Sequence, residues 1–449
     1  MNDYHLLLVT DKHFLPYTFV ACQSVIDSIG INKPAPLLVH NEISNQPTTP
    51  TDSSCLTKLD SGIAPAINNG VEPSITPKNL GYDNDRLIFH IMVDHSVDCT
   101  QLAEKAKVFS ERNASAIPHE MIIHQVEEKL FKKCKPWGKQ KSYGIYYRLL
   151  IDQILDQSIS TVLYLDVDIL VRADIRQLFH RYSLDNQVLG ACLDMIAQQP
   201  GTSDGQTFNT KPSLFQGLLN NYFNSGILLI NLQEWRRLNI GKQCIDILQR
   251  HDFEHPDQDA LNYVVEKPVL LEQTWNCQII FFYHQLLQII PQDKLQKLPQ
   301  YSLLQSYTTG SNRDYSAFIT AACPNGGIDL TQPIVFAPAI VHFIMGSSKP
   351  WHINYLNFYG EAIYPHPQAL VLALNEWYTT AARVSEFPEL QRFTPISYND
   401  SMDLYVVETR KSITAFEKRI TQKRRRERKY FLAALAILFI IQIMMLIFR

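Results

Sequence analysis

The sequence predicts an α/β fold built around a mostly parallel, doubly wound sheet. Runs of aliphatic and β-branched residues, typical of buried strands, alternate along the chain with segments whose apolar residues recur at helical spacing. The first pair is an apolar run at residues 6–10 and a helical segment at residues 17–29, which Gly30 is placed to end. Because strands that alternate with helices tend to pair in parallel, this order favours a sheet covered by helices on both faces.

The same alternation continues through the middle of the chain, and the pattern becomes mainly helical from about residue 351. The further expected strands are residues 87–93, 161–165, 188–193 and 226–231. The further expected helices are residues 101–113, 143–155, 370–382 and 402–423. Polar residues 201–211 predict a loop that covers a site.

Residues 41–80 interrupt this alternation. Twenty of these forty residues are Ser, Thr, Pro or Asn, and none is aromatic. Such a composition cannot bury enough apolar surface to form a core. We therefore predict a low-complexity insert or surface loop within residues 33–85.

The composition suits a folded protein of more than one domain, with 449 residues, of which 46% are hydrophobic and 19% charged. A net charge of -3 argues against nucleic-acid binding. The eight cysteines lack Cys-x-x-Cys spacing, which argues against zinc or redox motifs and predicts free thiols in a reducing compartment. The first residues lack the basic region of a signal peptide, so we expect none.

The last residues predict a membrane helix. Residues 430–448 carry no charge, and as a helix they would span roughly 28 Å, close to the thickness of a bilayer core. Residues 423–429 hold six positive charges and one negative charge. By the positive-inside tendency, the body of the protein would lie on the cytoplasmic face of the inner membrane. The alternative is a helix that lies flat on the membrane.

Two carboxylates, Asp166 and Asp168, follow directly after the expected strand at residues 161–165. At the carboxyl end of a strand in an α/β sheet, such a pair is suited to a divalent metal that carries the phosphates of a ligand. The alternative is a pair of solvated loop carboxylates that cap the next helix. The Asp-x-Asp pattern alone does not decide between them.

Four segments in a fixed order strengthen the metal interpretation: residues 166–168, 224–231, 257–262 and 342–351. The last segment reads His-x-x-x-Gly-x-x-Lys-Pro-Trp. Over residues 4–30 and 87–352, the chain resembles glycosyltransferase family 8. It is most similar to the bacterial lipopolysaccharide glucosyl- and galactosyltransferases, with glycogenin and the galactinol synthases as distant relatives.

The resemblance implies a GT-A fold at residues 1–352. The residue pattern adds a helical region at 353–422, the basic cluster at 423–429 and the membrane helix at 430–448. It implies a retaining hexosyltransferase that uses Mn²⁺ or Mg²⁺ and a UDP-sugar such as a UDP-hexose. The acceptor would be a lipid-linked oligosaccharide such as lipopolysaccharide core. Two alternatives stay open: a metal-dependent sugar-nucleotide hydrolase or nucleotidyltransferase, and a membrane-tethered, non-enzymatic sugar-nucleotide binder.

By resemblance, Asp166, Asp168 and His342 would be the metal ligands, and the imidazole would favour Mn²⁺. For His342 the alternative is a packed histidine in a strand at residues 340–343. The residues implied to contact the UDP-sugar are Val9, Thr10, Asp11, Phe14, Arg148, Asp166, Val167, Asp168, Asn224, Gly346 and Lys349.

Phe14 stands where the family usually has a tyrosine that stacks on uracil, so donors other than UDP-sugars stay open. Arg148 could instead be a surface arginine paired with Asp152, and Lys349 a solvated lysine.

The residues implied for the chemistry are Asp194, Asp257 and Gln258. Gln258 occupies the position that a double-displacement mechanism would require as a nucleophile, and an amide is a poor one. We therefore expect front-face substitution, in which the departing phosphate helps to deprotonate the acceptor hydroxyl. Asp257 would stabilise the oxocarbenium-like state.

Overall fold

A computed structural model describes residues 2–35, 37–39, 84–136, 142–194, 222–253, 255–279, 335–344, 349–351, 357–358, 361–362 and 368–393. Several predicted features lie outside these ranges: Gly346, the loop at 201–211, the helix at 402–423, the basic cluster at 423–429 and the helix at 430–448. Among the helices that are described, none has the length and apolar content needed to cross a bilayer.

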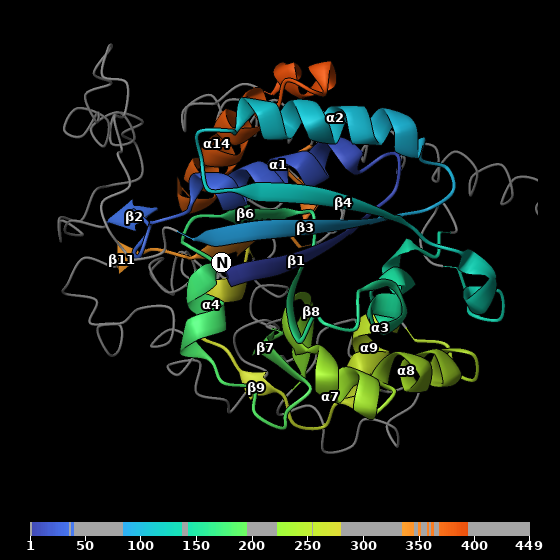
Figure 1. Ribbon diagram of the computed structural model, residues 1–449. Coiled ribbons are helices and arrows are strands. Elements are labelled where there is room, and N and C mark those ends of the chain that lie inside the picture. The colour runs from blue at the N-terminus through green and yellow to red at the C-terminus, as the bar shows by residue number, and fades with distance from the viewer. Residues whose placement is uncertain are drawn as a thin grey trace, which may run out of the picture.

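A seven-stranded sheet forms the centre of the protein, in the order β4-β3-β1-β5-β8-β7-β9 (Figure 1). Neighbouring strands run parallel except where β8 pairs with β5 and β7. The prediction of a mostly parallel sheet is therefore confirmed. The strands are β1 (Asn2–Thr10), β3 (Asp85–Val93), β4 (His119–Gln125), β5 (Thr161–Leu165), β7 (Leu189–Leu193), β8 (Phe223–Asn231) and β9 (Val269–Leu270).

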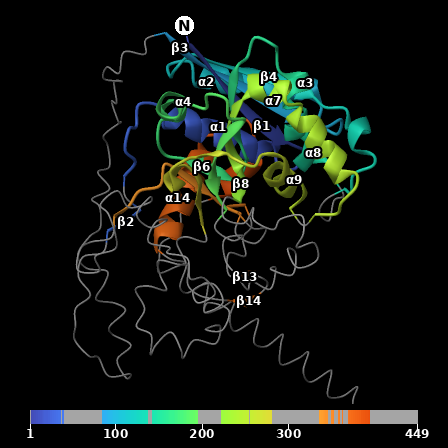
Figure 2. The same ribbon diagram turned by 90° about the horizontal axis from the view of Figure 1, so that it is seen from below.

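Helices cover both faces of this sheet (Figures 1 and 2). One face packs against α1 (Leu15–Asp27), α2 (Cys99–Arg112), α4 (Arg176–Arg181) and α14 (Gln368–Ala382). The other packs against η3 (Gly144–Leu150), α3 (Ile151–Ile154), α7 (Leu232–Arg237), α8 (Ile240–Leu248) and α9 (Pro256–Val264). Since α14 joins the same core as α1, this core continues past the predicted domain boundary at residue 352.

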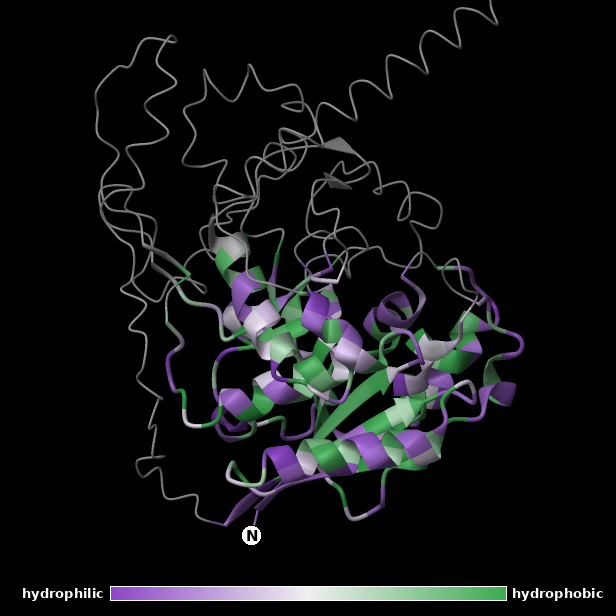
Figure 3. Cartoon of the chain, turned by 90° about the horizontal axis from the view of Figure 1, so that it is seen from above, coloured by the Kyte–Doolittle hydropathy of each residue, from purple (hydrophilic) through white to green (hydrophobic). Residues whose placement is uncertain are grey.

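The central strands β1, β5 and β8 each contain a run of mainly apolar residues, at 6–9, 162–165 and 227–230, because both faces of the sheet are covered there. On β1, Leu6 and Leu8 face the core shared with α1, whereas Leu7 faces the core shared with α7 and α8. Figure 3 shows apolar residues along the enclosed strands and polar residues on the outer surfaces of helices and loops. Because successive residues face one buried core or the other, these strands appear as apolar runs and are recognisable in the sequence.

A second, three-stranded sheet holds the segment that follows β5. It consists of β10 (Cys277–Gln278), β12 (Ile340–His342) and β6 (Ile169–Val171), in that order. The Asp166–Asp168 segment is the link between β5 and β6, so it joins the two sheets. The Asp166 amide donates to the Gly226 carbonyl at 2.7 Å, and the Phe343 amide donates to the Asp168 carbonyl at 2.8 Å. The backbone of this link is therefore fixed from both sides.

The predicted helix at residues 143–155 is wrong in type over most of its length. Residues 144–150 form the 3-10 helix η3, and only residues 151–154 form an α-helix. Tyr146, Tyr147, Arg148 and Leu149 are all buried, which exceeds the single buried stripe of an amphipathic α-helix. Tertiary contacts on several sides of this segment therefore decide its geometry.

The described parts of residues 33–85 and 353–422 contain short strand pairs. β2 (Leu38–Val39) pairs with β11 (Val335–Phe336), and β13 (Asn357–Phe358) pairs with β14 (Glu361–Ala362). Asp85 is already the first residue of β3. Among the described residues there are also short 3-10 helices at η2 (Glu128–Phe131), η5 (Gln273–Asn276) and η7 (Pro388–Arg392). The cysteines among the described residues are free thiols, as predicted.

Candidate active site

Asp166, Asp168 and His342 meet at the carboxyl end of β5, although His342 lies far along the chain. The antiparallel pairing of β12 with β6 places His342 opposite Ile169 and so beside the two carboxylates. The His342 Nε2 atom is 3.4 Å from Asp168 Oδ1 and 3.7 Å from Asp166 Oδ2. One ligand atom from each residue lies within 4.8 Å of the others. The structure thus brings together the three ligands that the resemblance implies.

This donor set fits a divalent cation. His342 is only 2% exposed, and burial lowers its pKa to about 4, so the imidazole is neutral at pH 7. A neutral imidazole nitrogen and two carboxylates are suitable ligands for Mn²⁺, while carboxylates alone would suit Mg²⁺ equally well. The packed strand histidine proposed as the alternative does lie in a strand, but its Nε2 atom faces the acid pair.

Lys349 forms an ion pair with one of these two acids, Asp168. Its Nζ atom donates to Asp168 Oδ2, and burial lowers its pKa to about 8. Lys349 is therefore not a solvated surface lysine. It supplies a positive charge at the edge of the candidate metal site, where a phosphate could compete with Asp168 for it.

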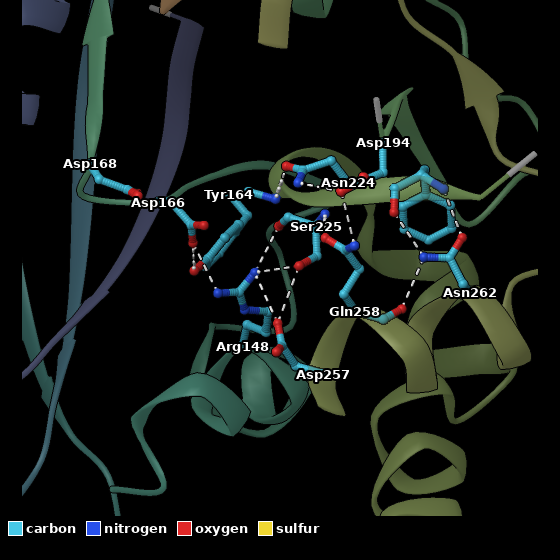
Figure 4. A network of polar contacts seen from close by, with 12 residues as sticks. Arg148, Tyr164, Asp166, Asp168, Asp194, Asn224, Ser225, Asp257, Gln258 and Asn262 are labelled. Atoms are coloured by element: carbon cyan, nitrogen blue, oxygen red, sulfur yellow. Dashed lines mark hydrogen bonds and ion pairs between the residues drawn. The ribbon is translucent and has the colours of Figure 1, made fainter. Parts of the chain in front are cut away.

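Arg148 is buried behind the acid pair, with 7% of its surface exposed. Its Nη2 atom donates to Asp166 Oδ1 at 2.9 Å, and its Nη1 atom donates to the Ser225 carbonyl at 2.7 Å (Figure 4). Nη1 also lies 3.3 Å from Asp257 Oδ2. The alternative of a surface arginine paired with Asp152 is therefore wrong, because η3 faces the sheet here.

Tyr164 completes the support of Asp166. Its hydroxyl donates to Asp166 Oδ1 at 2.6 Å, and its ring lies 4.2 Å from the Arg148 guanidinium. Burial raises the Tyr164 pKa well above its usual value, so the hydroxyl keeps its proton. With Oδ1 held by these two donors, Asp166 turns Oδ2 towards His342.

The residues implied for sugar binding and chemistry form a second group next to this one (Figure 4). Asp194 Oδ2 accepts hydrogen bonds from Asn224 Nδ2 and Gln258 Nε2, both at 3.0 Å. Gln258 Oε1 accepts from the Ser225 amide at 3.0 Å, and Asp257 Oδ2 accepts from Ser225 Oγ at 3.2 Å. β7, β8 and α9 therefore converge on one polar cluster.

Asn262 anchors α9 in this position. Its side-chain oxygen accepts from the Phe223 amide, and its Nδ2 atom donates to the Phe223 carbonyl, each at 2.8 Å. These paired bonds dock α9 against the first residue of β8. They fix the position of Asp257 and Gln258, near the start of α9, relative to the sheet.

The implied base-binding segment, which includes Val9 and Thr10, lies at the neighbouring strand end. β1 runs parallel to β5 with Leu8 opposite Leu165, so Asp11 and Asp166 leave the same edge of the sheet. Asp11 Oδ1 accepts from the amides of His13 and Phe14 at 2.8 and 3.2 Å, which fixes the turn into α1.

The Phe14 ring lies edge-to-face with Trp351, with centroids 5.8 Å apart. Trp351 in turn stacks on Tyr17 at 3.9 Å. The first and last segments of the resemblance therefore touch, although the sequence separates them by most of the chain. Of the implied donor contacts, only Gly346 lies outside the described residues.

Four contributors to this site are not singled out by the sequence: Tyr164, Ser225, Gly226 and Asn276. Tyr164, in β5, lies two residues before Asp166, and in an extended chain this spacing puts both side chains on the same side. Asn276 Oδ1 lies 2.9 Å from His342 Nδ1. No local pattern marks it, because it follows Trp275 in a short 3-10 helix.

The family model described as glycosyl transferase family 8 matches residues 5–301. A lipopolysaccharide 1,3-galactosyltransferase of Salmonella typhimurium is 27% identical over 222 residues, which are 48% of this chain and 61% of the relative. A lipopolysaccharide 1,2-glucosyltransferase of Escherichia coli K12 is 28% identical over 217 residues, which are 48% of this chain and 59% of the relative. The chain thus spans about three-fifths of the length of these curated relatives.

Among solved structures, an active-site mutant of LgtC is similar, with a TM-score of 0.51 and 17% identity. The similarity covers 87% of this chain and 99% of the other. At this level of identity the likeness speaks for the fold. It supports the GT-A arrangement of a mostly parallel sheet between helices.

Proposed function

The chain belongs to glycosyl transferase family 8, and from this premise we propose that it is a retaining, metal-dependent glycosyltransferase. It transfers a hexose, glucose or galactose, from a UDP-sugar to a lipid-linked glycan such as lipopolysaccharide core. The observation that carries the proposal is the convergence of Asp166, Asp168 and His342 beside Lys349 and Arg148. The relatives described as lipopolysaccharide glycosyltransferases support the acceptor class.

The metal would be held by Asp166, Asp168 and His342, and when bound it supplies positive charge that stabilises the departing diphosphate. Lys349 adds a point charge at the same end. Arg148 and Tyr164 hold Asp166 in the orientation that the ligand set requires. The roles of Val167, Gly346 and the segment from Val9 to Phe14 in binding the nucleotide belong to this proposal as well.

Gln258 supports front-face substitution over double displacement. Its Oε1 atom is engaged by the Ser225 amide, and its Nε2 atom donates to Asp194 and to the Tyr222 hydroxyl. A neutral amide held at both ends can orient a sugar but is a weak nucleophile. Asp194 and Asn224 would bind sugar hydroxyls. Asp257, held by Arg148, would stabilise positive charge that develops on the anomeric carbon.

A donor screen tests the function. The purified full-length chain is incubated with UDP-glucose, UDP-galactose or UDP-N-acetylglucosamine, in Mn²⁺, in Mg²⁺ or in EDTA, with and without a lipopolysaccharide core acceptor. We expect Mn²⁺-dependent release of UDP from one hexose donor and a glycosylated lipid with retained anomeric configuration. Free sugar as the sole product in the presence of acceptor would favour a hydrolase. A lack of both turnover and Mn²⁺-dependent UDP binding would contradict the proposal.

We also propose that residues 430–448 attach the enzyme to the cytoplasmic face of the membrane, close to a lipid-linked acceptor. The support is the length and apolar content of this segment and the basic residues before it. An arginine at a helix centre in the bilayer costs about 2.5–3.5 kcal/mol on insertion scales. Leu438→Arg should therefore shift the expressed protein from the membrane pellet to the supernatant. Equal pelleting of the variant and the wild type would refute the attachment.

A further inference from the structure

Four buried polar side chains form a continuous line from Asp194 to His342. Asn224 Nδ2 donates to Asp194 at 3.0 Å, Asn276 Nδ2 donates to Asn224 Oδ1 at 2.9 Å, and Asn276 Oδ1 lies 2.9 Å from His342 Nδ1. Asn276 is 0% exposed. The line thus connects a residue implied for sugar binding with a residue implied as a metal ligand, through two amides shielded from water.

The direction of every hydrogen bond in this line follows from its anchors. An amide side chain can face a partner with either its oxygen or its nitrogen, and only the partners decide which. The Gly226 backbone amide can only donate, and it meets the Asn224 side chain at 3.0 Å, so the atom there is Oδ1. The Asp194 carboxylate accepts from the other end of the same amide. Two independent neighbours therefore assign the same orientation to Asn224.

The orientation of Asn224 determines the rest of the line. Because the Asn224 Oδ1 atom can only accept, the Asn276 atom that contacts it must be the donor Nδ2. The Asn276 Oδ1 atom therefore faces His342. That oxygen accepts only, so Nδ1 of His342 must carry the proton. A neutral imidazole has one N–H proton, and its Nε2 atom is left with a lone pair. This lone pair points at Asp166 and Asp168.

We infer that Asn276 is a positioning residue that holds His342 in the Nδ1–H tautomer. Asp194 and the Gly226 amide fix which atom of each side-chain amide donates and which accepts. The consequence for a metal rests on the proposed function. A proton on Nε2 would point at the cation, so the tautomer would have to change before binding. With Nε2 already free, the histidine is ready to bind, and residues that orient metal-binding histidines typically contribute 10–100-fold in metal affinity.

The tautomer can be measured without any metal. In ¹⁵N NMR of the metal-free full-length chain near pH 7.5, the His342 ring signals are identified by their loss in His342→Gln. We expect a protonated Nδ1 and an unprotonated Nε2 in the wild type. An Nε2–H tautomer in the wild type would overturn the inference, whatever the variants do.

Variants then test the part played by Asn276. Asn276→Leu keeps the number of side-chain heavy atoms and removes the acceptor, so His342 should lose the pure Nδ1–H signature and Mn²⁺ affinity should fall about 10–100-fold. Asn276→Asp keeps an acceptor for Nδ1–H but removes the donor to Asn224 Oδ1, so Nδ1 of His342 should stay protonated while the bond to Asn224 is lost. Asn113→Leu removes a buried amide that bonds to Gln23 and Phe109 outside this line, and it controls for general destabilisation.

If Asn276→Leu keeps both the tautomer and the Mn²⁺ affinity of the wild type, or if Asn113→Leu alters them equally, the positioning role is wrong. Failure of the proposed function would look different. The wild type would then bind no Mn²⁺ by calorimetry, while the NMR experiment would still report the tautomer of His342.

Discussion

Asp168→Asn should lower Mn²⁺-dependent sugar transfer by about 10³-fold, because metal ions contribute several kcal/mol to transition-state stabilisation and each 1.36 kcal/mol is a factor of ten. Asp168 Oδ1 lies 3.4 Å from His342 Nε2, and Oδ2 accepts from Lys349. The asparagine side chain preserves the volume of Asp168. It removes the negative charge that pairs with Lys349 and that a bound Mn²⁺ would require. The rate is measured from UDP release with the donor identified in the screen.

The matched control is Asp246→Asn. Asp246 is a carboxylate on α8 that pairs with Lys242 at the surface, so its loss should leave transfer and stability nearly unchanged. Thermal unfolding of both variants separates lost activity from lost folding. If Asp168→Asn keeps a rate near that of the wild type at saturating Mn²⁺, Asp168 is not a metal ligand and the metal scheme is incorrect.

Gly226→Ala should lower transfer by at least about 10²-fold, since small displacements of reacting groups can cost that much. The new Cβ would lie 2.9 Å from Asp166 Oδ2 and 3.0 Å from Asn224 Oδ1, and it would overlap the His342 ring. A methyl group fits there only if Asp166 and His342, the proposed metal ligands, move apart. Calorimetry should show weaker Mn²⁺ and UDP binding, together with a destabilisation of about 1–3 kcal/mol typical of overpacking.

Gly190→Ala on the adjacent strand β7 provides the control. A Cβ at this position would lie 2.9 Å from Leu271 Cδ2 and 3.3 Å from Leu184 Cδ2, so it is crowded as well, but by apolar side chains. We expect a comparable loss of stability with Mn²⁺ affinity preserved. Equal effects of the two substitutions on Mn²⁺ binding would show that Gly226→Ala does not act through its contacts with Asp166 and His342.

Local patterns predicted five of the seven strands of the central sheet, β1, β3, β5, β7 and β8, because burial on both faces leaves a run of apolar residues. They missed β4, whose residues are only partly buried or exposed, and the two-residue strand β9. Residues 161–165 were predicted with the bounds that the structure has, and the two acids after them were correctly placed at a strand end. The helix at 143–155 was predicted with the wrong geometry. Its apolar spacing fits an α-helix, but contacts on several sides produce a 3-10 helix and bury Arg148.

The comparison with a known family, and not the local pattern, connected His342 to the acid pair. Hydrophobic period and residue type report on neighbours along the chain. The pairing of β12 with β6, which brings His342 to Asp168, depends on strand register between distant segments. The same holds for Asn276 in η5, whose partners His342 and Asn224 come from the strands β12 and β8.

The sequence by itself determined the α/β class, the strand that leads to the acid pair and the identity of the groups available for metal chemistry. Only the tertiary structure decided that Arg148 and Tyr164 hold Asp166, that Gly226 leaves room for His342, and that Asn276 faces the imidazole. The physical reason is that periodicity encodes which residues are buried. Hydrogen-bond direction and close approach arise only when segments remote in the chain pack together.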